Sequence, residues 1–115
     1  MKKVTLYTYG LKNVRVVDGD TLECDIDLGF GVALTKCKVR VAHVNAPEKD
    51  TPEGIAAKEY TTKIVETSKS IVVTVKNHAK DKYGRILGDI FCDDSDLAQF
   101  LIANNHGVAY EGGAR

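Results

Sequence analysis

Hydrophobic and polar residues alternate in the first third of the chain. The even-numbered positions across 14–28 are apolar except where Asp18-Gly19-Asp20 interrupts them. Alternation with a period of two is typical of half-buried strands, and an Asp-Gly turn between two such runs predicts a β-hairpin. Gly29-Phe30-Gly31 ends the second strand. A third strand is expected over residues 36–44, and it should stop before Pro47, because proline has no N–H for a sheet ladder.

Helical spacing appears in two later segments. Thr51-Pro52-Glu53 provides a capping hydroxyl, a proline at the first helical position and an acid near the positive end of the helix dipole. Apolar residues then recur every three or four positions, which predicts a helix that starts at Pro52. The second helix is expected after Asp94 or Ser95, either of which can cap it, and its apolar face consists of Leu97, Ala98, Leu101 and Ile102.

Two more strands complete the expected order of elements. Residues 71–75 are rich in β-branched side chains, 77–84 are polar and typical of a loop, and 85–92 are expected to form a strand. The resulting order, β-β-β-α-β-β-α, is that of a mainly β, α+β fold: a five-stranded OB-fold Greek-key barrel with two flanking helices. A generic α+β sandwich is the alternative. At 115 residues, the chain 1–115 is expected to be one domain.

Composition excludes several classes of protein. Hydrophobic residues make up 43% of the chain and charged residues 28%, values that are ordinary for a globular domain and exclude a disordered one. There is no run of about 20 apolar residues, so no membrane span and no membrane partner are expected. The N-terminus shows no apolar signal segment, and the three cysteines are odd in number, so we expect a cytoplasmic protein with reduced thiols.

The charges sum to zero, but they are not evenly distributed. Sixteen basic and sixteen acidic residues cancel, which argues against binding nucleic acid through bulk positive charge. However, residues 18–27 include acids but no bases, and residues 36–40 include bases but no acids. Residues 69–85 contain five bases and one acid. This pattern places an acidic pocket beside basic strips, or it describes only separately solvated faces.

Two segments carry oxygen ligands. Asp18-Gly19-Asp20-Thr21 gathers two carboxylates in a tight turn and so offers hard oxygen ligands for Ca²⁺ or Mg²⁺, although Asp-Gly is also common in plain hairpin turns. Arg40 lies within an expected strand, where a cation needs an anionic partner. It is followed by Asn45-Ala46-Pro47-Glu48, which adds an amide oxygen and a carboxylate that can orient water.

A third segment carries cations and an aromatic ring. Asp81-Lys82-Tyr83-Gly84-Arg85 provides two cations for phosphate and a tyrosine that can stack on a base. A surface hairpin with an ordinary turn is the alternative.

In this order, the three segments resemble the staphylococcal nuclease (thermonuclease) family. That family pairs Asp-Gly-Asp-Thr with a later Arg…Asp-x-Pro-Glu and then Asp-Lys-Tyr-Gly-Arg, and the resemblance here runs from about residue 14 to 110. It implies an OB-fold barrel with flanking helices and a Ca²⁺-dependent phosphodiesterase acting on DNA and RNA. It also implies cleavage at the P–O5′ bond, which leaves 3′-phosphate ends.

The resemblance implies a role for each matching residue. Asp20, Asn45 and the backbone carbonyl of Ala46 would bind the metal. Asp18 would lie behind these ligands without binding the metal directly. Glu48 would act as general base or orient the water, and the scissile phosphate would be bound by Arg40 and Arg85. The nucleotide contacts would be Lys82, Tyr83 and Tyr110.

The sequence departs from the family pattern at several places. Asn45 replaces a carboxylate, so weaker calcium binding is expected. The segment 25–35 lengthens a hairpin, the family's last helix is expected to be absent, and only Tyr110 stands where the family has a pair of tyrosines. We expect a compact member of the phage or intracellular type, and a monomer. The alternative function is a non-catalytic module that binds nucleic acid or protein, but Glu48 and both arginines are retained.

Overall fold

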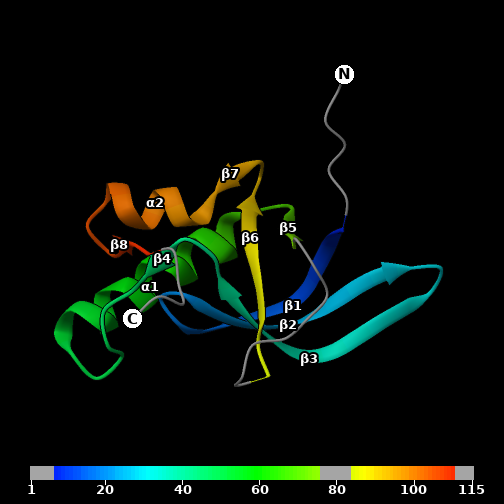
Figure 1. The fold of residues 1–115 in the computed structure, drawn as a ribbon, viewed down its shortest axis with the longest axis horizontal. Coiled ribbons are helices and arrows are strands. Elements are labelled where there is room, and N and C mark those ends of the chain that lie inside the picture. The colour runs from blue at the N-terminus through cyan, green and yellow to red at the C-terminus, as the bar shows by residue number, and fades with distance from the viewer. Residues whose placement is uncertain (1–6, 76–83, 111–115) are drawn as a thin grey trace.

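The strands of the chain close into a barrel (Figure 1). In the computed structural model, which describes residues 7–75 and 84–110, antiparallel pairings give the strand order β3-β2-β1-β5-β6, and a parallel pairing of β3 with β6 completes the ring. This confirms the expected five-stranded OB-type barrel. The barrel strands are β1 (Thr8–Asp18), β2 (Thr21–Gly29), β3 (Val32–Val41), β5 (Ile71–Thr74) and β6 (Ile86–Cys92).

Two helices lie outside the barrel at the end where β1 turns into β2 (Figure 1). Helix α1 (Pro52–Thr67) packs against β1, and α2 (Leu97–Ala103) packs against β6. The cap predicted for α1 is confirmed, since Thr51 Oγ1 accepts a hydrogen bond from the Gly54 N–H at 3.0 Å. Neither α1 nor α2 is both long and apolar enough to cross a bilayer, and they are the helices of the part of the chain that the structure describes.

Several expected boundaries are wrong. Strands β1 and β3 begin at Thr8 and Val32, earlier than the expected residues 14 and 36. The strand expected over 36–44 ends at Val41, because a turn at Ala42 and His43, the latter with a φ of 71°, separates it from the two-residue strand β4 (Val44–Asn45). The second helix is capped by Asp96, whose carboxylate accepts from the Ala98 N–H at 2.9 Å, and not by Asp94 or Ser95. Three short strands complete the described part of the chain: β4 pairs with β8 (Val108–Ala109), and β7 (Ser95–Asp96) pairs antiparallel with the end of β6.

The barrel interior contains the residues that the alternation predicted. Leu22 and Val39, from neighbouring strands, are fully buried together with Ile90. Cys24 is also in this core, and its burial raises the pKa of its thiol to about 12. The thiol therefore stays protonated and acts as a small core side chain.

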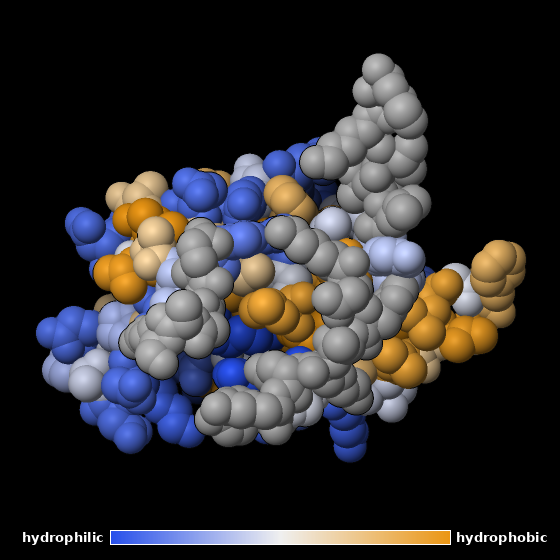
Figure 2. Space-filling model, viewed as in Figure 1, coloured by the Kyte–Doolittle hydropathy of each residue, from blue (hydrophilic) through white to orange (hydrophobic). Residues whose placement is uncertain are grey.

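The β2–β3 hairpin extends beyond the barrel, at the end opposite the helices (Figure 1). Its loop consists of Phe30 and Gly31, which both have positive φ, the signature of a type I′ turn. Phe30 is fully exposed, and Val32 and Leu34 are about half exposed. Figure 2 shows hydrophobic side chains gathered at this end of the molecule.

Candidate active site

The turn between β1 and β2 is held tightly against helix α1. A Cβ atom at Gly19 would lie 2.9 Å from the Cβ atoms of both Ala46 and Ala57, so only glycine fits there. The Thr61 hydroxyl, which is fully buried on the same face of α1, donates a hydrogen bond of 2.9 Å to the Gly19 carbonyl. The helix therefore fixes the position of the two carboxylates that flank Gly19.

The Asp20 carboxylate lies at the centre of the site. It is 8% exposed, and its Oδ2 accepts from the Ala46 N–H at 2.9 Å while the Thr21 hydroxyl donates to Oδ1 at 3.2 Å. Arg40 Nη1 lies 3.6 Å from Oδ2, so the anionic partner expected for this strand arginine is Asp20.

Arg40 connects strands β3 and β4 at the site. Its side chain is 11% exposed, and Nη1 donates to the carbonyl oxygens of Val41 at 2.6 Å and Val44 at 2.7 Å. Nη2 donates to Asn45 Oδ1 at 3.3 Å, and the guanidinium carbon lies 5.9 Å from the centre of the Tyr110 ring. The structure therefore brings Asp20, Asn45 and Tyr110 together around one guanidinium.

Asp18 contributes a carboxylate that the protein does not satisfy. Its Oδ1 is buried and has no hydrogen-bond partner among the described residues. Burial and the neighbouring Asp20 carboxylate raise the pKa of Asp18, whereas a hydrogen bond with the Thr21 side chain and the positive charge of Lys49 oppose that rise. A buried oxygen without a donor, beside a second carboxylate, is a suitable environment for a divalent cation.

The donor set fits a hard cation. Asp20 offers carboxylate oxygens and Asn45 an amide oxygen, and Asp18 adds a further carboxylate behind Asp20. Asn45 Oδ1 accepts from Arg40 Nη2, and it is the N–H of Ala46 that contacts Asp20. The described residues contain no group of three or more His, Cys, Asp or Glu side chains that could hold a metal ion, and the residue at position 45 is an amide.

Glu48 is exposed, and its backbone is fixed by the start of α1. Its carbonyl accepts from the Thr51 N–H at 3.1 Å and the Thr51 hydroxyl at 2.7 Å. A Cβ at Gly54 would collide with this same carbonyl, so the first turn of the helix packs directly on Glu48. The helix cap therefore positions the residue and leaves its carboxylate open to solvent.

Arg85 lies immediately before β6, which pairs in parallel with β3. Ile86 is the partner of Val39, and Leu87 is the partner of Arg40. Because paired residues of neighbouring strands share a face, Leu87 lies on the same face of this sheet as Arg40, and Arg85 is the residue directly before this strand. The predicted contacts Lys82 and Tyr83 lie outside the described residues.

Sequence reasoning missed the residues of α1 that support the site. Gly54, Ala57 and Thr61 recur every three or four positions and form a stripe of small, buried residues on one face of the helix. Such a stripe of small residues permits close approach of another backbone. It was the one feature of the sequence that could have indicated this contact. Their partner, the Gly19 turn, is 42 residues away from Thr61 in the sequence.

Replacing Thr61 with valine tests the attachment of the turn to the helix. Thr61→Val keeps the shape but leaves the buried Gly19 carbonyl without a donor, so we expect the free energy of unfolding to fall by about 1–3 kcal/mol in urea denaturation. The matched control is Thr62→Val, since the Thr62 hydroxyl donates to the Lys58 carbonyl on the exposed side of the same helix. Equal effects of the two substitutions would contradict this role of Thr61.

Replacing Asp18 with asparagine tests the unsatisfied carboxylate. Because the folded protein raises the pKa of Asp18, its ionised form costs stability at neutral pH, and that cost disappears as pH falls through the raised pKa toward 3.8. Asp18→Asn should therefore stabilise the protein at pH 7 in EDTA, and the difference should vanish in acid. The control Asp25→Asn should have the opposite sign at pH 7, since hydrogen bonds from Asn13 and Lys36 lower the pKa of Asp25. Destabilisation by Asp18→Asn at pH 7 would refute this account.

Comparison with known proteins agrees with the geometry. The family model described as staphylococcal nuclease homologue matches residues 38–112, more than half of the chain. An uncharacterized endonuclease of Escherichia coli is 33% identical over 99 residues, which cover 85% of this chain and 59% of that protein. The probable staphylococcal-like nuclease CAN1 of Oryza sativa subsp. japonica is 42% identical over 86 residues, 72% of this chain and 25% of that protein.

A third relative is much longer than this chain. Endonuclease YhcR of Bacillus subtilis (strain 168) is 32% identical over 108 residues, 84% of this chain and 8% of that protein. The chain therefore spans less than two thirds of the length of each of these curated relatives. The family match and the assembled site lead to one conclusion: the chain belongs to the staphylococcal nuclease homologue family.

Proposed function

We propose that this chain is a Ca²⁺-dependent nuclease that hydrolyses phosphodiester bonds of DNA or RNA at the P–O5′ bond and leaves 3′-phosphates. The observation that carries the proposal is the cluster around Arg40, which joins Asp20 and Asn45 beside the unsatisfied oxygen of Asp18. The printed names of the relatives, endonuclease and staphylococcal-like nuclease, support a nuclease.

The two arginines favour the transition state over the bound substrate. A phosphodiester gains negative charge as water adds to phosphorus, so fixed guanidinium groups stabilise that state more than the ground state. Three of the five N–H groups of Arg40 donate to Val41, Val44 and Asn45. The other two make no hydrogen bond to the residues that the structure describes. We assign those two N–H groups and Arg85 to the phosphate oxygens.

Glu48 orients and deprotonates the attacking water in this proposal. Its exposed carboxylate accepts a proton from the water as the new O–P bond forms, and the P–O5′ bond breaks as the leaving oxygen takes a proton from solvent. When bound, Ca²⁺ would add positive charge beside the phosphate and a coordination site for water. Asp20, Asn45 and the Ala46 carbonyl would hold the ion, with Asp18 behind them.

Replacing Glu48 with glutamine tests the enzyme against a non-catalytic binding module. Glu48→Gln should slow nicking of a supercoiled plasmid by at least about 100-fold, because the amide cannot accept the proton. EDTA should abolish nicking by the wild-type protein, and Ca²⁺ should restore it. The matched control is Glu53→Gln, since Glu53 is an exposed acid in the first turn of α1.

The other outcomes of this assay also decide the question. Equal nicking by Glu48→Gln and wild type would refute the assigned mechanism. Nucleic-acid binding by the wild type without any nicking, with or without Ca²⁺, would favour the binding module.

Replacing Asn45 with aspartate tests the assigned metal ligands. Asn45→Asp restores a negative charge at the proposed calcium site, so calorimetric titration should show Ca²⁺ binding about tenfold tighter than in the wild type. The control Gln99→Glu adds the same charge at an exposed position of α2 and should leave the Ca²⁺ affinity unchanged. Equal or weaker binding by Asn45→Asp would remove Asn45 from the ligand set.

A further inference from the structure

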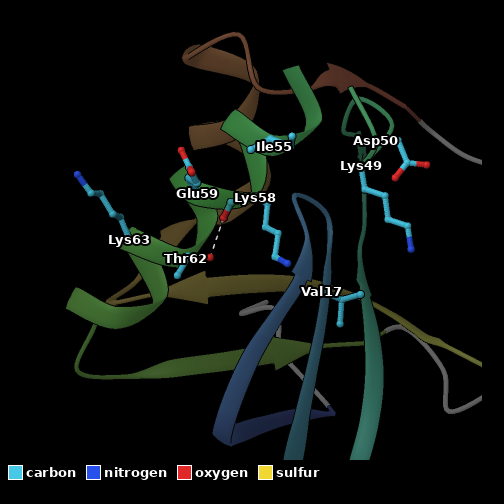
Figure 3. Close-up of a pocket in the computed structure, with 8 residues that line it drawn as sticks. All are labelled: Val17, Lys49, Asp50, Ile55, Lys58, Glu59, Thr62 and Lys63. Atoms are coloured by element: carbon cyan, nitrogen blue, oxygen red, sulfur yellow. Dashed lines mark hydrogen bonds between the residues drawn. The ribbon is translucent and has the colours of Figure 1, made fainter. Parts of the chain in front are cut away.

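An open groove of about 600 Å³ lies next to the candidate active site, between α1, the end of β1 and the loop before α1 (Figure 3). Val17, at one wall, precedes Asp18 in the chain, and Lys49, at another, follows Glu48. Two lining residues of the groove are therefore sequence neighbours of the proposed active-site residues Asp18 and Glu48, although neither Asp18 nor Glu48 lines it.

The groove is basic. Lys49, Lys58 and Lys63 line it, against the acids Asp50 and Glu59. Figure 3 shows Lys49 and Lys58 extending on either side of Val17, whereas the carboxylates of Asp50 and Glu59 point away from Val17.

The lysines of the groove form no ion pair with other residues that the structure describes. Among the described residues, the recorded ion pairs involve other cations, namely Lys12, Arg15, Arg40 and His43. Lys49 is also close enough to the Asp18 carboxylate to lower its pKa, which places its charge near the metal-binding turn. In a chain with no net charge, three unengaged lysines in one groove make a local positive site.

The dimensions suit a single polynucleotide strand. The space is that of a small-ligand pocket, which is too small to enclose a duplex. Lys58 and Lys63 are five residues apart on α1, so the helix separates them by about 7.5 Å along its axis and by about 140° around it. Figure 3 shows Lys63 extending outward at the far end from Lys49.

We propose that this groove binds the sugar-phosphate backbone of the substrate strand on one side of the scissile bond. Lys49 and Lys58 each contact one phosphate, and Lys63 contacts a phosphate farther along the strand. Lysines act as point charges on phosphate and carry no information about base sequence, so the groove favours longer strands without selecting their sequence. This inference rests on the proposed nuclease function, because it extends that site toward the rest of the substrate.

Binding is measured first, because it does not require cleavage. Fluorescence anisotropy of a labelled single-stranded octanucleotide in EDTA would compare the wild type with the double variant Lys49→Ala/Lys58→Ala. We expect the dissociation constant to rise by up to about fivefold for each lysine removed. The slope of log K against log salt should become shallower by about 1.4, or 0.7 for each lost phosphate contact. The matched control is Lys69→Ala, an exposed lysine just beyond the end of α1 and outside the groove.

Cleavage then separates the groove from the active site. Lys58→Ala should raise KM for the octanucleotide while leaving kcat/KM unchanged for a dinucleotide with one phosphodiester bond, and Lys58→Arg should restore octanucleotide binding. Thermal unfolding followed by circular dichroism would verify that each variant is folded.

The outcomes distinguish the groove from the proposed function. If the wild type cleaves nucleic acid and the double variant binds the octanucleotide as the control does, the groove proposal is wrong and the nuclease stands. If the wild type binds without cleaving and the double variant loses affinity, the groove stands and the nuclease proposal is wrong. No binding by the wild type would overturn the groove proposal, whatever the cleavage result.

Discussion

The candidate site depends on one close contact, the packing of the Gly19 turn between helix α1 and the loop that follows β4. A side chain at position 19 would overlap Ala46 on one side and Ala57 on the other. Because neither neighbour can move without displacing its own element, the turn, the helix and the loop are placed together or not at all. The Thr61 hydroxyl then satisfies the carbonyl that this contact removes from water. The absence of a side chain at Gly19 thus fixes the positions of Asp20, Ala46 and the residues before α1.

A second constraint is electrostatic: Arg40 holds the surrounding segments together and is also the cation proposed to bind phosphate. Its guanidinium is almost removed from solvent, so it must find acceptors inside the protein, and it finds them on three separate strands and loops. The same cation compensates Asp20, which would otherwise be a buried charge beside Asp18. Removing Arg40 would therefore disturb the fold as well as any phosphate contact, unlike removal of an exposed residue such as Glu48. The chain's zero net charge hides this arrangement, because opposite charges gather in the site and in the groove next to it.

The parts of the fold that sequence predicted well are those set by neighbouring residues. The alternation over 14–28 and the Thr51-Pro52 cap act over a few positions. The hairpin turn and the start of α1 lie where they were expected, although β1 begins earlier, at Thr8. The break after Val41 was missed because the apolar pattern continues through it, and only the backbone at His43 shows the turn. The support of the site by Gly54, Ala57 and Thr61 was missed for a different reason: it is a contact between distant segments, whose small residues give only a weak local signal. The family resemblance identified candidate residues but not what holds them in place.

The protruding β2–β3 hairpin has a consequence for how this domain can be altered. Its tip, at Phe30 and Gly31, and the carboxylate turn at Gly19 lie at opposite ends of the same strand, β2. Residues added to the hairpin in matched pairs keep every inward side chain inward, since side chains alternate with a period of two. The length of the hairpin can therefore change, or another domain can be inserted at its exposed tip, while the geometry around Arg40 stays as it is. In this chain, the length of β2 separates the candidate site from the hairpin tip.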